Sequence, residues 1–307
     1  MLKKRIDKLM GNRFEITVEA ERESDADFFL NLAVNEITRI EDKLSTFKEL
    51  SETNKINTNA GKKPVVISEE TFRLIQRSIK ISEITQGAFD ITYGSIDKRF
   101  WNFDTKMTSL PDRQDAKELV KLINYRNIVL NEKDFSVFLK EEGMRIGFGG
   151  IGKGYAAECA KKILIENGVS AGIVNASGDL TAFGNPKEAE KWTIGIAHPD
   201  IAHQPFSTMD ITDMAVATSG NYEKFVIIDG KKYSHTIDPK TGYPISGIKS
   251  VTIISPNAEI SDAFATPVTI MGIEAGLAMI NQIKGIECII IDDENKIYTS
   301  KNINLHN

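Results

Sequence analysis

A glycine-rich turn that leads into a helix is the stretch that most constrains how this chain can fold. Gly147 to Glu158 read GFGGIGKGYAAE, and Gly147, Gly152 and Lys153 match G-x-x-x-x-G-K, the start of a phosphate-binding P-loop. Glycines let backbone N–H groups approach a phosphate, and a helix N-terminus favours the anion. We therefore expect the fold to present this turn to a ligand, as a P-loop or in another phosphate chemistry.

The residue after the lysine argues against a P-loop. A working P-loop has Ser or Thr there, because that hydroxyl binds Mg²⁺, whereas this chain has Gly154. The run IIIDDE at 289–294 resembles the acidic strand of a nucleotide triphosphatase. However, Ile297 and Tyr298 follow so soon that a hairpin turn explains its acids better. The sequence disfavours a triphosphatase and keeps an anion-binding turn, to which Lys153 adds charge.

Hydrophobic periodicity predicts strands and helices without the regular alternation of a doubly wound fold. Residues 13–18 alternate as a half-buried strand, and a long amphipathic helix follows, with Ser24 and Asp27 resembling a capping box at its start. Its inward side chains recur at spacings of three and four, at Ala26, Phe29, Ala33, Ile37, Ile40 and Leu44. We therefore predict an α+β fold, with mixed sheets and flanking helices.

Further elements are predicted along the rest of the chain. Residues 45–61 and 101–110 read as loops, and Ser68 is expected to cap a helix that ends near Gly87. The inward side chains of that helix are expected to be Phe72, Ile75, Ile79 and Ile84. The other expected helices cover 153–167, closed by Gly168, and 258–283. The other expected strands lie around 194–196, 216, 225–228, 251–254 and 288–291, with a hairpin at Asp229-Gly230.

Length and charge limit the domain organisation and the partners. A chain of 307 residues without a repeat or a low-complexity linker predicts a single domain, or two intertwined subdomains with the site between them. A net charge of -5 argues against a nucleic-acid partner, which would need clustered Lys and Arg. Cys159 and Cys288 lack metal-ligand spacing and read as core residues, although one disulfide between them stays open.

Polar residues also gather where a fold alone does not require them. These stretches are GAFDIT at 87–92, NASGDL at 175–180, ATSGNYEKF at 217–225 with SHTIDPKTG at 234–242, and SDAFATPVTIMG at 261–272. Together with the glycine turn, they resemble the ApbE family of FAD:protein FMN transferases. The resemblance extends from Met10-Gly11 to about Gly272, and five matching stretches in the right order make it specific. It implies an ApbE-like α+β fold.

The resemblance also implies a reaction and its partners. The enzyme would bind FAD with Mg²⁺ on its pyrophosphate, and a Thr or Ser hydroxyl of an acceptor flavoprotein would attack the FMN-side phosphorus. AMP would leave, and FMN would stay attached through a phosphoester. Acceptors in this family are typically subunits of membrane redox pumps or related flavoproteins. Family members are commonly periplasmic and often lipid-anchored. This sequence shows no signal peptide or lipobox cysteine, so a cytoplasmic location stays open.

Three residues match metal-binding positions of the family, and a fourth, Glu259, lies one turn before Asp262. Asp262 and Thr266 supply an acid and a hydroxyl, and their i, i+4 spacing places both on one helical face. Gly150 offers its backbone carbonyl, and Glu259 adds a further oxygen directly or through the neighbouring ligands. Such hard oxygen ligands suit Mg²⁺. Without the family, the same residues would read as a helix cap, a surface threonine and a solvated acid in the first helical turn.

A larger set matches positions on the FAD side. Lys153 lies near the phosphates, and Gly147 replaces an acid that usually contacts the flavin or adenosine side. The positions that contact the flavin match Met10, Phe47, Ala88, Phe89 and Asp90. Asn175 and Asp179 are expected to order a loop of the site, and Ser219 and Gly220 to approach flavin or phosphate. Phe47 and Phe89 could equally be core aromatics, whereas Asp90, inside an apolar run, needs a polar partner.

The histidine of the S-H-T-I-D-P signature is the predicted general base. His235, with Thr236 beside it in the cofactor site, could position or deprotonate the incoming hydroxyl. We therefore assign catalytic roles to His235, Lys153 and Asp262. A structural histidine beside the turn that Asp238 begins is the alternative.

Departures from the family pattern leave two other functions open. Ser177 stands where glycine is usual, and Asn12 replaces a threonine. Pro267 is expected to push Thr266 out of the helical conformation and so to disturb its pairing with Asp262. The same site could serve a metal-dependent FAD pyrophosphatase, in which water yields FMN and AMP. A non-catalytic flavin-binding carrier is the third hypothesis.

Overall fold

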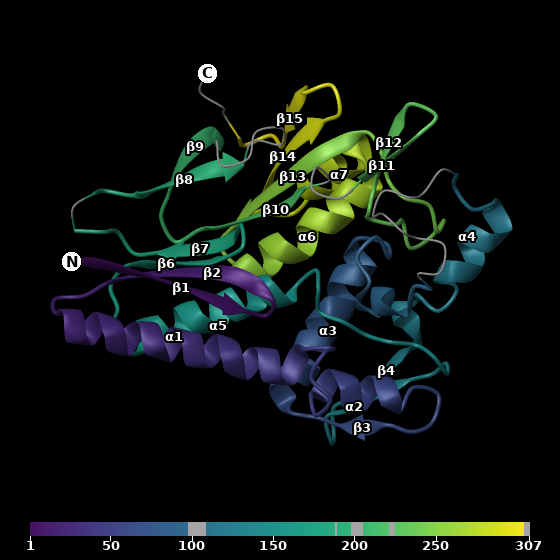
Figure 1. Cartoon of the computed structure of the whole chain (residues 1–307), viewed down its shortest axis with the longest axis horizontal. Helices are drawn as coiled ribbons and strands as arrows, with labels where there is room; N and C mark the ends of the chain where they lie inside the picture. Colours follow the sequence, from purple (N-terminus) through teal and green to yellow (C-terminus); the bar gives the residue numbers. More distant parts are fainter. Residues whose placement is uncertain (98–108, 188, 198–204, 221–224, 304–307) are drawn as a thin grey trace.

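The computed structural model describes residues 1–97, 109–187, 189–197, 205–220 and 225–303 (Figure 1). An eight-stranded sheet has the order β1-β2-β6-β7-β10-β13-β14-β15, and its neighbouring strands are antiparallel. The strands are β1 (Leu2–Leu9), β2 (Asn12–Glu19), β6 (Gly172–Ala176), β7 (Asp179–Phe183), β10 (Ala215–Gly220), β13 (Ile248–Ser255), β14 (Glu287–Asp292) and β15 (Ile297–Thr299). Antiparallel strands combined with packed helices confirm the predicted α+β class.

Three long helices cover one face of this sheet. They are α1 (Glu23–Leu44), α5 (Gly152–Glu166) and α6 (Ala258–Met271). Helix α5 lies between the other two and contacts both, and it packs on β6 and β7 (Figure 1). Helix α7 (Ile273–Ile280) follows α6. The main hydrophobic core therefore lies between the sheet and this helical layer.

The opposite face of the sheet is covered by a hairpin. Strands β8 (Trp192–Ala197) and β9 (Pro205–Ile211) pair with each other. Trp192, Ile194 and Ile211 form a second hydrophobic cluster with residues that point outward from the large sheet, among them Leu180 and Val216. A separate hairpin joins β11 (Phe225–Ile228) to β12 (Lys231–Ser234) through Asp229-Gly230, as predicted.

A smaller group of elements lies beside the sheet and its helices (Figure 1). Its elements are α2 (Glu52–Thr58), α3 (Glu69–Ile84), α4 (Arg113–Val120), the 3₁₀ helices η1 (Ile91–Ser95) and η2 (Tyr125–Asn127), and the strands β3 (Val65–Val66), β4 (Ile128–Asn131) and β5 (Ser136–Leu139). Helix α3 contacts α6, so this group meets the helical layer there. Division of the chain into one domain or two subdomains stays a prediction.

The helix predictions hold in outline and fail in detail. Periodicity identifies α1, whose buried residues include Ala33, Ile37 and Ile40, but its N-cap is Arg22 and no side chain caps it, so the capping-box prediction is wrong. Ser68 caps α3 as expected, by accepting a hydrogen bond from the Thr71 N–H. The region read as a polar loop contains α2, because the Ser51 side chain accepts the N–H of Asn54 and starts a helix.

Other predicted elements also require correction. Ile84 is exposed rather than inward, at the end of α3. The predicted helix over 258–283 is two helices, because Gly272 adopts a φ of +83° between α6 and α7. Cys159 and Cys288 are both free thiols. Most of the predicted loop at 101–110 lies outside the described residues.

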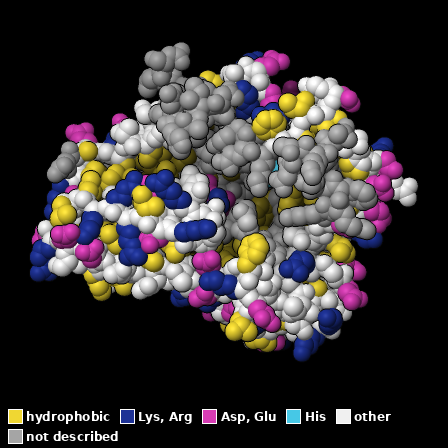
Figure 2. All heavy atoms as spheres, viewed as in Figure 1, with side chains coloured by type: hydrophobic (Ala, Val, Ile, Leu, Met, Phe, Trp, Pro, Cys, Tyr) yellow, Lys and Arg dark blue, Asp and Glu magenta, His cyan; other side chains and the backbone are white. Residues whose placement is uncertain are grey.

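Charged side chains of both signs are interspersed over the described part of the face drawn in Figure 2. Among the residues that the structure describes, no helix combines the length and the apolar character needed to cross a bilayer.

Candidate active site

The glycine turn leads into α5 where that helix meets α6. The Gly154 N–H, in the first turn of α5, donates a 2.9 Å hydrogen bond to Asp262 Oδ2 on α6. A Cβ atom on Gly154 would lie 2.1 Å from the carbonyl oxygen of Ala258. Any side chain at 154 would therefore overlap the backbone of α6. This contact explains why glycine replaces the hydroxyl residue of a P-loop.

Lys153 and two buried acids form the charged centre of this crossing. Lys153 Nζ is ion-paired with Asp179 at the start of β7. Burial raises the pKa of Asp179, and Lys153 opposes that rise. Burial also raises the pKa of Asp262. The negative charge of Asp179 raises it further, so the two carboxylates repel each other. A single lysine is therefore the positive partner of two buried carboxyl groups, and this arrangement favours the binding of a second cation.

The predicted oxygen ligands lie on α6 and in the glycine turn. Helix α6 continues through Pro267 to Met271, so the expectation that proline disrupts Thr266 is wrong. Asp262 and the half-buried Thr266 therefore stay one turn apart on the same helix. Packing of α6 on the sheet outweighs the hydrogen bond that proline cannot donate to Ala263. Gly150 lies in the turn just before α5, also half-buried.

Glu259 is buried and paired, so its interpretation as a solvated acid is wrong. Its Oε1 and Oε2 accept hydrogen bonds of 2.6 and 2.9 Å from Arg77 Nε and Nη2 on α3. The Arg77 guanidinium also lies 5.7 Å from the centre of the Tyr155 ring on α5. Both carboxylate oxygens therefore hold α3 against α6. The metal role predicted for Glu259 stays a prediction, and no sequence pattern indicated Arg77 as its partner.

The tip of the β1–β2 hairpin and the loop after α1 flank the glycine turn. Met10 has a φ of +50° and donates its N–H to Glu41 Oε2 at 3.0 Å. A Cβ on Gly152 would lie 3.8 Å from Met10 Cε, and one on Gly147 would lie 3.7 Å from Thr46 Cγ2. Next to Thr46, Phe47 is 97% exposed and is not a core aromatic. Met10 and Thr46 thus lie beside the turn, and the flavin contacts of Met10 and Phe47 stay predictions.

The GAFDIT stretch lies next to the glycine turn, with Phe89 close to Gly150. Ala88 and Phe89 are buried, and a Cβ on Gly150 would lie 3.7 Å from the Phe89 ring. Asp90 accepts hydrogen bonds from the Thr92 N–H, the Thr92 hydroxyl and the Tyr125 N–H, at 2.6 to 2.8 Å. Burial raises the pKa of Asp90 despite these bonds. The partner that Asp90 needs is therefore supplied by the protein itself, and its flavin contact stays a prediction.

The loops that carry the remaining predicted residues are ordered by their own polar side chains. Asn175 Oδ1 accepts the Gly178 N–H at 2.8 Å across the turn before Asp179, as expected of a residue that orders this loop. Ser177, in that turn, has a φ of +57°. Ser219 and Gly220 end β10. Their contact with a ligand stays a prediction.

The signature histidine follows β12 directly. His235 is exposed, whereas Thr236 is buried and donates its N–H to Ser234 Oγ at 3.0 Å. Asp238 accepts hydrogen bonds from the Lys240 N–H and the Thr241 hydroxyl, which confirms the predicted structural turn. His235 is therefore accessible to solvent, and its role as a general base stays a prediction.

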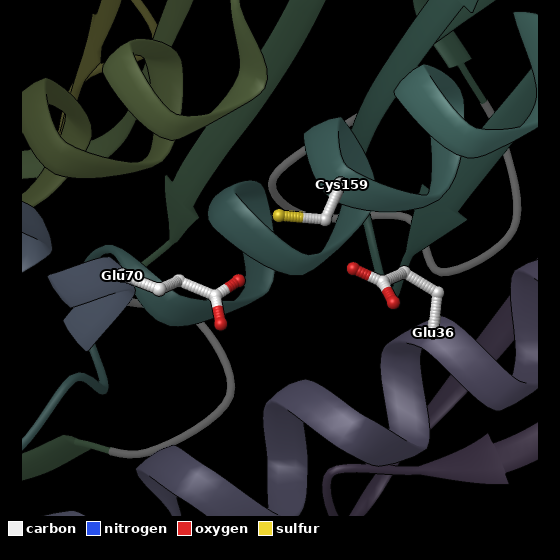
Figure 3. Close-up of side chains that lie close together, drawn as sticks. All are labelled: Glu36, Glu70 and Cys159. Atoms are coloured by element: carbon white, nitrogen blue, oxygen red, sulfur yellow. The ribbon is translucent and has the colours of Figure 1, made fainter. Parts of the chain in front are cut away.

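A second cluster of acids lies on the far side of α5. Figure 3 shows Glu36 of α1, Glu70 of α3 and Cys159 of α5 pointing toward one another, with their ligand atoms within 4.8 Å. Arg39 pairs with both acids, and Lys43 pairs with Glu70. These cations already neutralise the carboxylates, and burial raises the pKa of Cys159 to about 12. The cluster is therefore an ion-pair network between α1 and α3, beside which α5 places a neutral thiol.

Comparisons with known proteins agree with this arrangement. The sequence profile of the ApbE family matches residues 10–290. An FAD:protein FMN transferase from Klebsiella pneumoniae (strain 342) is 32% identical over 266 residues, which cover 86% of this chain and 82% of that relative. The ApbE protein of Thermotoga maritima has a TM-score of 0.86 at 30% identity, covering 98% of this chain and 97% of its own. The flavinyl transferase ApbE of Pseudomonas stutzeri, with a TM-score of 0.85 at 21% identity and coverage of 98% and 95%, supports the fold alone. The chain therefore belongs to the ApbE family, and the prediction of a flavin-transferring enzyme is confirmed.

Proposed function

We propose that this protein transfers FMN from FAD to a Thr or Ser hydroxyl of an acceptor flavoprotein, with Mg²⁺, and releases AMP. The observation that carries the proposal is the buried Asp262 carboxylate, held at the N-terminus of α5 beside the Lys153–Asp179 pair. The relatives named FAD:protein FMN transferases support the choice of FAD as donor.

The chemistry of the donors fits a magnesium ion. Asp262, Thr266 and the Gly150 carbonyl would supply three hard oxygens, and Mg²⁺ takes such ligands together with waters and substrate phosphates. Burial raises the pKa values of Asp179 and Asp262, and a cation bound beside the two carboxylates would stabilise their charged forms. When bound, the ion would neutralise charge on the pyrophosphate.

The chain's own residues would bind the substrate and orient the reacting groups. Lys153 binds phosphate oxygens at the start of α5, where the helix dipole favours an anion. Phe47, exposed beside the turn, offers an aromatic face to the flavin. The acceptor oxygen forms a bond to the FMN-side phosphorus, and the bond from that phosphorus to the AMP oxygen breaks. His235 accepts the proton of the attacking hydroxyl.

The acceptor that we propose is a subunit of a membrane redox pump or a related flavoprotein. A periplasmic or membrane-associated location would follow from such a partner and stays a proposal, with a cytoplasmic location open.

The decisive experiment measures AMP release and covalent flavin together. The protein is incubated with FAD and Mg²⁺, with and without a candidate acceptor, and mass spectrometry of the acceptor detects an added FMN. Steady AMP release without acceptor would favour the pyrophosphatase. Tight FAD binding without AMP under any metal condition would favour the carrier.

Two variants at one position test the metal assignment. Asp262→Ala should abolish Mg²⁺-dependent transfer while the protein stays folded. Asp262→Asn keeps an oxygen for the Gly154 N–H and removes only the charge, so it should lose transfer with a smaller loss of stability. Transfer retained by either variant at ordinary Mg²⁺ concentrations would contradict the role of Asp262.

A further inference from the structure

We propose that Glu158 is a positioning residue for Asp262, because α5 and α6 cap each other's N-termini where they cross; this inference rests on the proposed function. The Gly154 N–H of α5 donates to Asp262 Oδ2 of α6 at 2.9 Å. The Ala258 N–H of α6 donates to Glu158 Oε1 of α5 at 2.7 Å. Each helix therefore gives an amide and receives a carboxylate from the other.

The spacing within the two helices is the same. The capped amide and the capping acid are four residues apart in both, at 154 and 158 in α5 and at 258 and 262 in α6. One helical turn of α5 therefore faces one turn of α6 with opposite polarity. The missing side chain at Gly154 lets the backbones approach, since a Cβ there would lie 2.1 Å from the Ala258 oxygen.

The two hydrogen bonds between α5 and α6 run in opposite directions and together fix the position of the first turn of α6. With only the Asp262 bond, the first turn of α6 would be tied to α5 at a single point. The Glu158 bond holds the first residue of α6 one turn away from Asp262, so the position of that turn along α5 is set at two points. First-turn N–H groups lack partners within their own helix, so both bonds also satisfy donors that would otherwise be unpaired.

Glu158 is itself held rigidly. Its other carboxylate oxygen, Oε2, lies 2.6 Å from Lys161 Nζ, and that ammonium donates to Thr181 Oγ1 at 3.1 Å. Thr181 lies on β7, the strand that begins with Asp179, the partner of Lys153. Glu158 therefore connects α6 to the same strand that holds the lysine.

The chain offers a matched control on α6. Asn257 caps the same helix through Oδ1, which accepts the Ile260 N–H at 3.1 Å, without bridging to α5. Asn257→Ala and Glu158→Ala each remove one cap from the first turn of α6. Only Glu158→Ala removes the link to α5. A purely structural role predicts equal effects, and a positioning role predicts unequal ones.

The test compares the Mg²⁺ affinities and the stabilities of full-length variants. Titration calorimetry with Mg²⁺ alone, repeated with FAD bound, should show a Kd about tenfold higher for Glu158→Ala, since residues that orient a ligand typically contribute at least that factor to metal affinity. Asn257→Ala should change Kd less than twofold at a similar fall in Tm. Glu158→Gln, which keeps the acceptor oxygen, should stay close to the unmodified protein. Saturating Mg²⁺ should restore kcat in Glu158→Ala.

Several outcomes would overturn the proposal, and they separate it from the proposed function. Equal Mg²⁺ Kd values in Glu158→Ala and Asn257→Ala would refute the positioning role of Glu158. FMN transfer by the unmodified protein would still support the proposed function in that case. If the unmodified protein binds Mg²⁺ but transfers no FMN, the function fails and the Kd comparison still decides the role of Glu158. Should Glu158→Ala fail to fold, Glu158→Asp replaces it. The shorter side chain keeps the charge but moves the acceptor oxygen away from the Ala258 N–H. An unchanged Kd for Mg²⁺ in this variant would contradict the proposal.

Discussion

Gly154 and Asp262, 108 residues apart in sequence, are joined by a 2.9 Å hydrogen bond from the backbone N–H of the first to the carboxylate of the second. The bond depends on a helix contact so close that a Cβ at 154 would overlap the Ala258 carbonyl. The glycine that departs from the P-loop pattern is thus required by helix packing.

Restoring the P-loop residue should therefore damage this protein. Gly154→Ser should lower the free energy of unfolding by about 1–3 kcal/mol, the usual cost of overpacking, and should abolish Mg²⁺-dependent transfer by displacing Asp262. Chemical denaturation and the FMN transfer assay measure the two effects. Gly149→Ser is the control for the denaturation measurement, because a Cβ there would meet nothing within 4 Å. If both variants behave alike, close packing does not explain Gly154.

The network around Glu70 should make stability depend on pH at the acidic end. Hydrogen bonds from Arg39 lower the pKa of Glu70 to about 2, with Lys43 and Tyr155 contributing. The folded pKa lies below that of the unfolded chain, so the stabilisation is complete above about pH 4.5 and disappears as the pH falls toward 2.

Glu70→Gln should therefore cost about 1–2 kcal/mol at neutral pH, a modest amount because solvent screens a partly exposed network. The difference from the unmodified protein should shrink steadily between about pH 4.5 and 2, as measured by urea denaturation. Glu69→Gln is the matched control, since its ion pair with Arg73 is exposed. A pH-independent difference would show that Glu70 acts through packing alone.

Ser177 should be a site where glycine stabilises the protein. Its φ of +57° places a side chain in the left-handed region, which costs about 1–2 kcal/mol. Ser177→Gly removes that strain. Glycine also raises the conformational entropy of the unfolded chain, which costs about 0.4–1 kcal/mol of stability, so only a small rise in Tm is expected. Ser177→Ala keeps the strain and should show no rise. A fall in Tm for the glycine variant would mean that the serine hydroxyl compensates for its backbone.

Phe47 should contribute to binding and not to stability. The side chain is 97% exposed, so Phe47→Ala should leave the unfolding free energy within about 0.5 kcal/mol of the original. Loss of an aromatic contact with the flavin should raise the Kd for FAD about fivefold, which corresponds to roughly 1 kcal/mol. Fluorescence titration measures this. Leu50→Ala, 83% exposed on the same loop, should leave the Kd unchanged.

Local signals carried much of the sequence prediction. Periodicity located α1 and α3, the Ser68 cap and Gly168 fixed helix ends, and the Asp229-Gly230 pair located a hairpin. These features depend on neighbours within a few residues, which sequence patterns record directly. The glycine turn was found in the same way, as a motif.

What the sequence could not show depends on long-range contacts. Arg77 meets Glu259 across 182 residues, and Glu158 meets Ala258 across 100. No local pattern records such pairs. Local rules also failed where packing overrides them, since Pro267 lies inside α6 and α2 forms in a stretch that reads as loop. The sequence left open whether Phe47 and Phe89 are core aromatics, and the structure exposes the first and buries the second.

The pairing of Lys153 with Asp179 has a consequence for selectivity. An ammonium that already has a counter-ion gains little by exchanging it for a bare phosphate, because one anion merely replaces another and leaves an acid buried without compensation. A dinucleotide that arrives with its own divalent cation avoids this cost, since the cation can compensate the acid that the lysine releases. The pair would thus discriminate against free phosphate and metal-free nucleotides in favour of a metal-complexed pyrophosphate.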